Sequence, residues 1–236
     1  MDILFFLAAF FSEVIGTIVG FGSSTVFLPL ALFFVDFKTA LVLVAFLHVF
    51  GNLGRIGFFR HGLDKRTLVI FGIPSVVLTL LGTFLVSYIS QDLFKGILGL
   101  FLVVYALISL WKEDLTVKQT LASSIIGGGL SGFLAGLIGT GGALRGAFLT
   151  AFGIPKEKYI ATAAAIALAV DLTRIPVYFA GGFLRQEFYW YIPFLFVIAL
   201  VGSFTGKQIV TKIPQKNFKK AVLVAILLIG VKFIYE

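Results

Sequence analysis

The sequence predicts an all-α polytopic membrane protein made of two inverted repeats, and three observations support this fold class. Hydrophobic residues make up 59% of the 236 residues and charged residues only 13%, whereas soluble domains average about 45–50% and about 25%. Two stretches of the chain repeat each other. Each repeat also begins with an apolar segment that is too long for one membrane crossing. Apolar segments recur along the whole chain with short polar loops between them, so we expect membrane-embedded structure throughout.

The repeat appears when the chain is compared with itself at an offset of 119 residues. From residue 12 to about residue 62 the two copies align without a gap, and the matches fall on small or polar residues within apolar segments. They include Ser12 with Ser131, Gly20 with Gly139, Gly22 with Gly141, Asn52 with Asp171, Arg55 with Arg174, and Gly62 with Gly181. We therefore predict a tandem duplication.

The elements follow the same order in both repeats: one long apolar segment with a glycine-rich middle, then three plainer ones. We place the first repeat at 1–112, a cytoplasmic linker at 113–120 and the second repeat at 121–236. The long segments cover about 3–34 and 121–153, and the others about 39–59, 67–88, 93–111, 158–180, 188–210 and 217–235. A helix spanning 3–34 would be about 48 Å long, against about 30 Å for a hydrocarbon core. The long segments must therefore tilt, break or turn back.

The loop charges favour turning back. Of the 19 Lys and Arg residues, 16 remain when Arg55, Arg145 and Arg174 are set aside as lying within spans. If every segment crosses once, these charges divide seven against nine, which predicts no orientation. If both long segments are re-entrant hairpins, they divide four against twelve, as the positive-inside rule expects. We therefore predict six crossings and two re-entrant hairpins, with both termini outside and the repeats inverted.

The glycine-rich turns at 20–22 and 139–142 are the first candidate binding elements. Irregular backbone at membrane depth needs protein or a water-lined cavity to satisfy its polar groups, and the free N–H groups of the helix that follows attract anions. The residues expected to contact an anion here are Gly20, Gly22, Ser23, Ser24, Thr25, Gly139, Thr140, Gly141 and Gly142. The alternative is that these glycines only let helices pack closely. Their recurrence in register in both repeats favours binding.

The three arginines within apolar spans are the second candidates, because a charge at such a position is costly and usually faces a cavity or a partner. Asp171 and Arg174 lie three apart on one helical face, so an ion pair within the helix is the alternative to substrate contact. Asn52 replaces this Asp in the first repeat, so Arg55 either contacts the substrate or extends to the cytoplasmic surface. Asn52 and Asp171 are counted with the arginines as candidate substrate-binding residues. Arg145 has no acidic residue within a turn or two, which makes it the leading candidate for an anion contact.

Glu13 and His48 are the remaining ionisable residues within apolar segments. Either is a candidate for proton coupling, because buried carboxylates and histidines both exchange protons near neutral pH. The alternatives are that Glu13 pairs with an arginine or lies near the mouth of the hairpin, and that His48 is a hydrogen-bonded helix residue. The chain has no cysteine and two histidines, so we expect no metal site and no cofactor.

The sequence also argues against other classes of protein. It contains no HExxH motif and no Ser-His or paired-Asp arrangement, so we do not expect an enzyme. The net charge of +8 arises mostly from Lys and Arg in loops beside the spans, which indicates membrane topology rather than nucleic-acid binding. The expected partners are a small anion and the lipid bilayer, and wide apolar faces are compatible with a homodimer.

The stretch GFLAGLIGTGGALRGAFLTAFGIPKEKYIATAAAIAL at 132–168, together with the repeat of its glycine-rich turn at 20–22, resembles the TauE/SafE family of sulfite and organosulfonate exporters. The resemblance extends over essentially the whole chain, and it implies a duplicated permease for small sulfur-containing or related organic anions. The sequence departs from the family pattern at Ser23 and Ser24, at Ala143, and at Arg145, which stands at an ordinarily apolar position. Side chains at the turns are expected to choose the anion.

Together these observations predict a secondary transporter of the cell membrane that exports a small anion such as sulfite, a sulfonate or a related sulfur oxoanion. The anion is expected to bind at the midplane between the two glycine-rich hairpin tips. The alternatives are an anion channel and a membrane scaffold or accessory protein.

Overall fold

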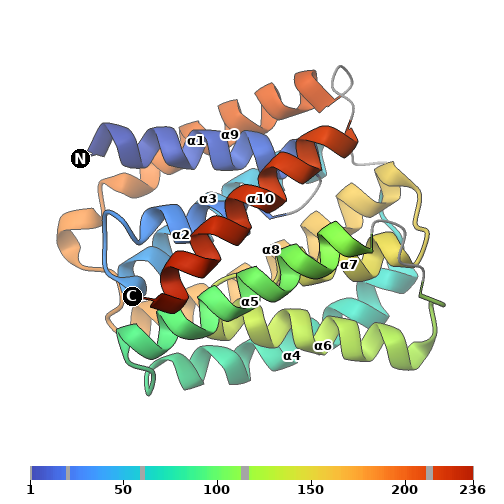
Figure 1. The fold of residues 1–236 in the computed structure, drawn as a ribbon, viewed down its shortest axis with the longest axis horizontal. Coiled ribbons are helices and arrows are strands. Elements are labelled where there is room, and N and C mark those ends of the chain that lie inside the picture. Colours follow the sequence, from blue (N-terminus) through green and yellow to red (C-terminus); the bar gives the residue numbers. More distant parts are fainter. Residues whose placement is uncertain (1, 20–21, 59–61, 113–116, 211–214, 236) are drawn as a thin grey trace.

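The computed structural model describes residues 2–19, 22–58, 62–112, 117–210 and 215–235, and within these ranges the chain is helical without strands (Figure 1). The helices of the first half are α1 (Asp2–Val19), α2 (Ser23–Ala31), α3 (Phe37–Phe58), α4 (Lys65–Val86) and α5 (Gln91–Trp111). Those of the second half are α6 (Leu121–Ile138), α7 (Gly142–Ala151), α8 (Lys156–Ala180), α9 (Tyr191–Val210) and α10 (Gln215–Tyr235). A short 3₁₀ helix, η2 (Gln186–Phe188), precedes α9.

Among the described residues, seven helices are long and apolar enough to cross a membrane, namely α1, α3, α4, α5, α6, α8 and α9. Their outward faces carry large apolar side chains, for example Val69, Ile73 and Val77 along α4. Continuous apolar surface of this kind is rare on soluble monomers. The predicted all-α polytopic membrane fold is therefore confirmed. The orientation of the two repeats relative to the membrane stays a prediction.

Both long apolar segments break at a glycine. Gly22, directly before α2, has φ +87°, and Gly139, directly after α6, has φ +72°. This left-handed backbone conformation is strained for residues with a Cβ but open to glycine. The sequence positions of the two glycines thus determine where α1 gives way to α2 and where α6 gives way to α7.

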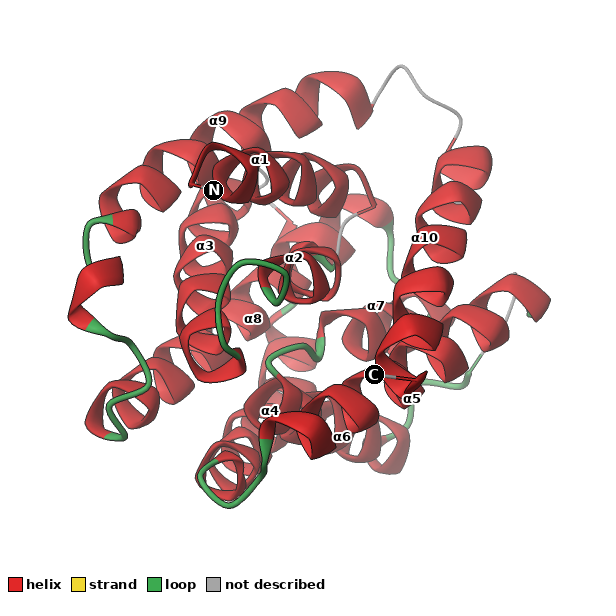
Figure 2. Cartoon of the chain, turned by 60° about the vertical axis from the view of Figure 1, so that its left-hand side comes forward, coloured by secondary structure: helices red, strands yellow, loops and turns green. Residues whose placement is uncertain are grey.

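After each break the chain folds back along the helix that it has just left. The Phe5 ring near the start of α1 lies 5.2 Å from the Phe27 ring of α2. In the second half, a Cβ on Gly127 of α6 would lie 2.7 Å from the Phe148 ring of α7. Each long segment is therefore a helical hairpin with one long and one short arm. Figure 2 shows the short arms, α2 and α7, in the middle of the bundle with longer helices around them.

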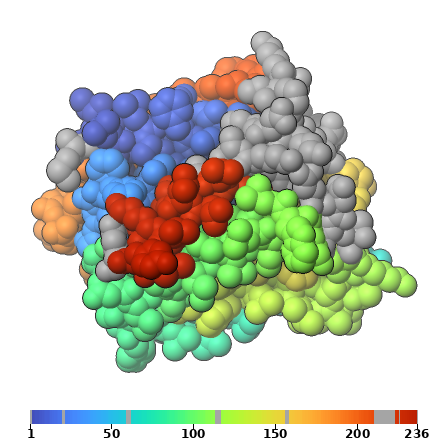
Figure 3. Space-filling model, in the orientation of Figure 1, coloured from blue at the N-terminus to red at the C-terminus, as the bar shows by residue number. Residues whose placement is uncertain are grey.

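Each of the longer helices packs against a helix from the other half of the chain. The long hairpin helix of the first half, α1, packs on α9, and its counterpart α6 packs on α4. Helices α3 and α8 pack against each other, as do α5 and α10. In Figure 1, α1 lies beside α9 at the top of the view and α4 beside α6 at the bottom, and Figure 3 shows α10 lying on the outer face beside α5. Neither half thus forms a bundle by itself.

Glycines and hydroxyl groups hold α4 against α6 at very short range. A Cβ on Gly132 would collide with the carbonyl oxygen of Ser75. The hydroxyls of Ser75 and Thr79 donate to the carbonyl oxygens of Gly128 (2.8 Å) and Gly132 (3.0 Å). Small residues allow such close approach in membranes, and hydrogen bonds between the helices add to it. Helix α4 thus supports α6, the long arm of the second hairpin, from outside.

Candidate functional site

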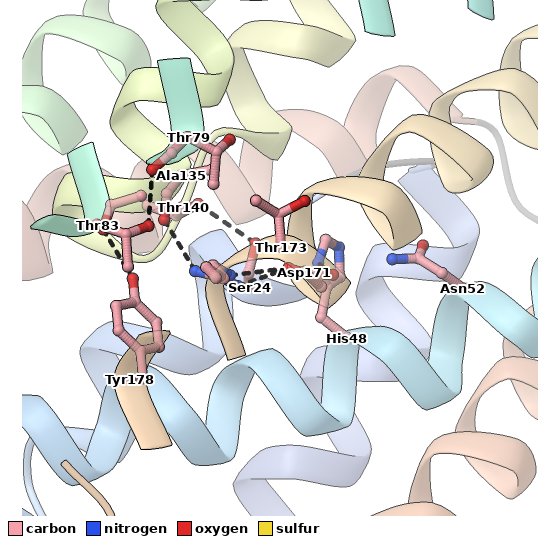
Figure 4. Close-up of polar contacts among 12 residues, drawn as sticks. Ser24, His48, Asn52, Thr79, Thr83, Ala135, Thr140, Asp171, Thr173 and Tyr178 are labelled. Atoms are coloured by element: carbon pink, nitrogen blue, oxygen red, sulfur yellow. Dashed lines mark hydrogen bonds and ion pairs between the residues drawn. The ribbon is translucent and has the colours of Figure 1, made fainter. Parts of the chain in front are cut away.

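The two hairpin tips meet in the interior of the protein. The Thr25 hydroxyl of the first tip lies 2.6 Å from the Thr140 hydroxyl of the second, and the Ser24 hydroxyl lies 3.4 Å from it. A Cβ on Gly142 would lie only 3.3 Å from the backbone nitrogen of Gly22. All three hydroxyl residues are buried, and Figure 4 shows Ser24 and Thr140 within the polar cluster. The meeting point therefore joins the start of α2, the start of α7 and a set of hydroxyl groups.

Arg145, on α7, lies at this meeting point with part of its hydrogen-bonding capacity unused. It is 3% exposed, and its Nε and Nη1 atoms have no hydrogen-bond partner within the described ranges. Its Nη2 atom lies 3.7 Å from the position that a Cβ on Gly142 would take, so the guanidinium folds back toward the start of α7. No ion pair involving Arg145 occurs among the described residues. A buried cation without a counterion is energetically expensive, and a bound anion would supply what is missing.

Arg55 connects α3 to the first hairpin. It is 2% exposed, so the alternative that it extends to the cytoplasmic surface is wrong. Its guanidinium donates to oxygen atoms of four buried residues: Thr17 (3.3 Å), Asn52 (2.9 Å), Ser23 (3.2 Å) and Glu13. Because Ser23 begins α2, one side chain reaches both the tip of the hairpin and its long arm.

Glu13 is the carboxylate partner of Arg55, as one of the sequence interpretations proposed. The side chain is 0% exposed. Its Oε1 atom also accepts hydrogen bonds from Ser203 of α9 (2.8 Å) and Thr17 (3.4 Å), whereas Oε2 has no partner. The buried hydroxyl of the neighbouring Ser12 likewise has none. One of the two carboxylate oxygens of Glu13 can thus accept a further hydrogen bond.

Arg174 forms the ion pair within its own helix that its spacing from Asp171 predicts. Its Nε and Nη2 atoms lie 2.9 and 2.8 Å from Oδ1 of Asp171. Its Nη1 atom donates to the carbonyl oxygen of Ala135 in the last turn of α6 (2.9 Å), where a cation is favoured by the helix dipole. The Tyr178 hydroxyl donates to the next carbonyl, that of Gly136 (2.7 Å). Arg174 therefore caps the C-terminal end of α6, directly before the second tip.

His48 contacts the Asp171–Arg174 pair rather than the Glu13–Arg55 pair. Its Nδ1 atom lies 2.8 Å from Oδ2 of Asp171, which brings α3 and α8 together at the centre of the bundle. Figure 4 shows His48 and Asp171 in contact, with Asn52 one turn further along α3. The amide nitrogen of Asn52 is buried without a partner.

The structure thus brings most of the sequence-predicted residues to one region around the two tips. Gly139 and Gly141 shape the second turn, where a Cβ on Gly139 would lie 3.7 Å from Arg174. Gly20 lies outside the described residues. Sequence reasoning did not select Thr17 or Ser203. The spacing of Thr17 four residues after Glu13, and the match of Ser203 with Thr83 in the other repeat, were the available signals.

The arrangement defines a class of protein: a multi-pass membrane protein in which two broken helical hairpins meet at a buried cationic centre. The family model for the sulfite exporter TauE/SafE matches residues 5–233, and the chain belongs to this family. The match extends over both repeats and includes the whole site, so the resemblance seen in the sequence is confirmed. A comparison with curated proteins found no match. The chain is therefore a member of a family of membrane exporters for sulfite and organosulfonates.

Proposed function

We propose that this protein is a secondary transporter that exports sulfite, a sulfonate or a related sulfur oxoanion and binds it where the two hairpin tips meet. The observation on which the proposal depends is Arg145, a buried guanidinium beside the starts of α2 and α7 that has two unpartnered nitrogens and no ion pair among the described residues. Membership of the TauE/SafE family supports the same class of substrate.

The surroundings of Arg145 suit an oxoanion with several acceptor oxygens. The first turns of α2 and α7 present backbone N–H groups that favour negative charge. Ser24, Thr25 and Thr140 add hydroxyl donors, and Arg55 reaches the first tip through Ser23. Arg174 has a different role, because Asp171 and the Ala135 carbonyl already occupy its nitrogens.

The burial of the site supports a carrier rather than a channel. Glu13, Arg55, Arg145 and the three tip hydroxyls are all almost completely enclosed, so an anion enters or leaves only after helices move. We propose that one hairpin, with the helix on which it packs, moves against the other, as in transporters built from related halves. Transport by purified protein should then saturate with anion concentration, whereas a channel would conduct in proportion to the gradient.

The decisive experiment measures uptake of labelled sulfite into liposomes that contain the purified protein. Replacing Arg145→Gln should lower the apparent affinity by roughly 10- to 150-fold, because a hydrogen bond to a charged group contributes about 1.5–3 kcal/mol. Arg145→Lys, which keeps the charge, should lower it less. Arg185→Gln is the matched control, since Arg185 is exposed and pairs with Asp36 and Glu187. Unchanged sulfite transport by the Arg145→Gln protein would refute the assigned site.

The orientation follows from the loop charges and has its own test. We propose that both termini lie outside, with the linker at 113–120 in the cytoplasm. A reporter that is active only in the cytoplasm should be inactive when fused to the C-terminus and active when inserted in the linker. Activity at the C-terminus would contradict the orientation without affecting the proposed site.

A further inference from the structure

The charges of the side chains buried around the tips do not sum to zero. In the part of the chain that the structure describes, the buried charged side chains are three guanidiniums, from Arg55, Arg145 and Arg174, and two carboxylates, from Glu13 and Asp171. With His48 neutral, one positive charge remains. A singly charged anion would neutralise the site, whereas a doubly charged anion would leave one negative charge in a medium of low polarity. Such an excess is costly and is usually relieved by uptake of a proton.

The two carboxylates differ in how firmly they are held. Asp171 is held through Oδ1 by two nitrogens of Arg174 on its own helix, and its Oδ2 atom lies 2.8 Å from Nδ1 of His48, although neither of these two atoms has a hydrogen-bond partner among the described residues. Glu13 contacts only one nitrogen of its arginine, Nη2 of Arg55 on another helix, and its Oε2 atom has neither a hydrogen bond nor an ion pair among the described residues. Glu13 is therefore the carboxylate that an incoming anion displaces more easily.

A single nitrogen atom links Glu13 to the tip of the first hairpin. The Nη2 atom of Arg55 donates to Oε1 of Glu13 and also lies 3.2 Å from the Ser23 hydroxyl at the start of α2. An anion at the tip that takes a hydrogen bond from this nitrogen competes directly with Glu13. Once Arg55 turns to the anion, Glu13 remains in the interior without a cation.

We propose that a doubly charged oxoanion displaces Glu13 from Arg55 and that Glu13 then binds one proton, so that the anion and a proton occupy the protein together. This inference rests on the proposed function. The proton comes from a buffer acid or a hydronium ion in the surrounding solution: the bond from that acid to hydrogen breaks, its conjugate base stays in solution, and an O–H bond forms on the Glu13 carboxylate. Three guanidiniums and one carboxylate then balance an anion of charge −2. A singly charged anion is balanced with Glu13 still ionised and brings no proton.

The surroundings of Glu13 suit both of its protonation states. On α3 the facing charged group is Arg55, while His48 contacts Asp171 instead. On α9, Ser203 donates to Glu13, and Lys207 lies over the Phe58 ring. The hydroxyls of Ser203 and Thr17 donate to a carboxylate and, after rotation, accept a hydrogen bond from a carboxylic acid. Among the described residues on α1, α2, α3 and α9, no second cation forms an ion pair with Glu13 in place of Arg55.

Calorimetric titration of the purified protein tests the proposal with two probes whose charges stay constant near neutral pH. Thiosulfate is a dianion and methanesulfonate a monoanion. Repeating each titration in buffers of different ionisation enthalpy counts the protons taken up. We expect about one proton per thiosulfate, with an affinity that falls about tenfold per pH unit above neutrality, and about zero protons per methanesulfonate. Glu13→Gln should abolish the uptake with thiosulfate, whereas His48→Gln should retain it.

Infrared difference spectra of the unaltered protein provide a second readout in case Glu13→Gln does not fold. Thiosulfate, but not methanesulfonate, should produce the C=O band of a protonated carboxylic acid. Thiosulfate binding without proton uptake, equal uptake with both anions, or uptake that persists in Glu13→Gln would overturn the inference while leaving the transport proposal intact. Failure of both probes to bind would instead refute the proposed anion site and this inference with it.

Discussion

The two halves of the protein share a framework but hold their equivalent arginines in different ways. Arg55 and Arg174 match in the sequence repeat, and each pairs with one carboxylate. In the first half the carboxylate comes from a different helix, as Glu13 on α1. In the second it comes from the same helix, as Asp171. The charge partner is thus retained while its position has moved, which makes Arg174 locally fixed and Arg55 dependent on contacts between helices.

The packing of α6 explains why the second half does not repeat the arrangement of the first. Gly132 is the residue that matches Glu13 in the repeat. Because a Cβ on Gly132 would collide with the Ser75 carbonyl oxygen, no longer side chain fits at this position. The close approach of α6 to α4 therefore excludes a carboxylate there, and Asp171 supplies the charge from α8.

The tips differ as well. The first presents the hydroxyl side chains of Ser23, Ser24 and Thr25, whereas the second presents glycines, one hydroxyl from Thr140, and Arg145, which matches Val26 in the first half. The unbalanced positive charge thus comes from the second tip and most of the hydroxyl donors from the first. In the proposed site a single anion uses both, which would be a physical reason for the two predicted repeats to differ at their tips.

The largest expected effect is the loss of the second ion pair, which joins Asp171 to Arg174. Asp171→Asn should destabilise the protein by about 3–5 kcal/mol, because it leaves a buried arginine without its charge partner. Apart from Asp171, the hydrogen-bond acceptor shown for Arg174 is the Ala135 carbonyl. Thermal unfolding in detergent measures the loss. A melting temperature equal to that of the unaltered protein would show that the second ion pair does not support the fold.

A smaller loss is expected in the first half, and it should be repairable. Glu13→Gln should cost about 1.5–3 kcal/mol, because Arg55 keeps three neutral acceptors. Adding Asn52→Asp places a carboxylate at the position that the second half uses, 2.9 Å from Arg55. The double variant should recover at least half of the lost stability in the same unfolding measurement. A double variant less stable than Glu13→Gln would contradict the equivalence of the two halves.

Gly132→Ala tests the packing of α4 against α6 that distinguishes the second half. We expect a loss of about 1–3 kcal/mol from overpacking against backbone atoms. The matched control is Gly96→Ala on α5, where a Cβ would meet no atom within 4 Å and a gain of up to about 1 kcal/mol is expected from helix propensity. Two measurements distinguish the variants: the fraction that elutes as monodisperse protein and the melting temperature. Equal behaviour of both variants would argue against the close approach.

The smallest effect concerns the hydroxyl groups along the same interface. Thr79→Val keeps the shape of the side chain but removes the hydrogen bonds to the carbonyl oxygens of Ser75 and Gly132. The expected loss is about 0.6 kcal/mol, the average for such bonds between membrane helices. A double variant with Gly132→Ala should lose less than the sum of the two single losses, because both changes act on one contact. Strict additivity would indicate that the hydroxyl and the glycine act independently.

The amino-acid sequence by itself determined the membrane class, the family, and Arg145 as a charge without a nearby acidic residue. These depend on composition, motif and spacing, which are properties of neighbouring residues. The breaks at Gly22 and Gly139 follow from the backbone freedom of glycine, which is also local. The ion pair of Arg174 was one of two readings that the spacing of Asp171 left open. Only the tertiary structure decided that Glu13 pairs with Arg55 and that Arg174 closes the end of α6, because contacts between helices depend on which faces pack together. The same packing excluded the surface position of Arg55 and left Arg145 buried where the two halves meet, with no counterion in the part of the chain that the structure describes.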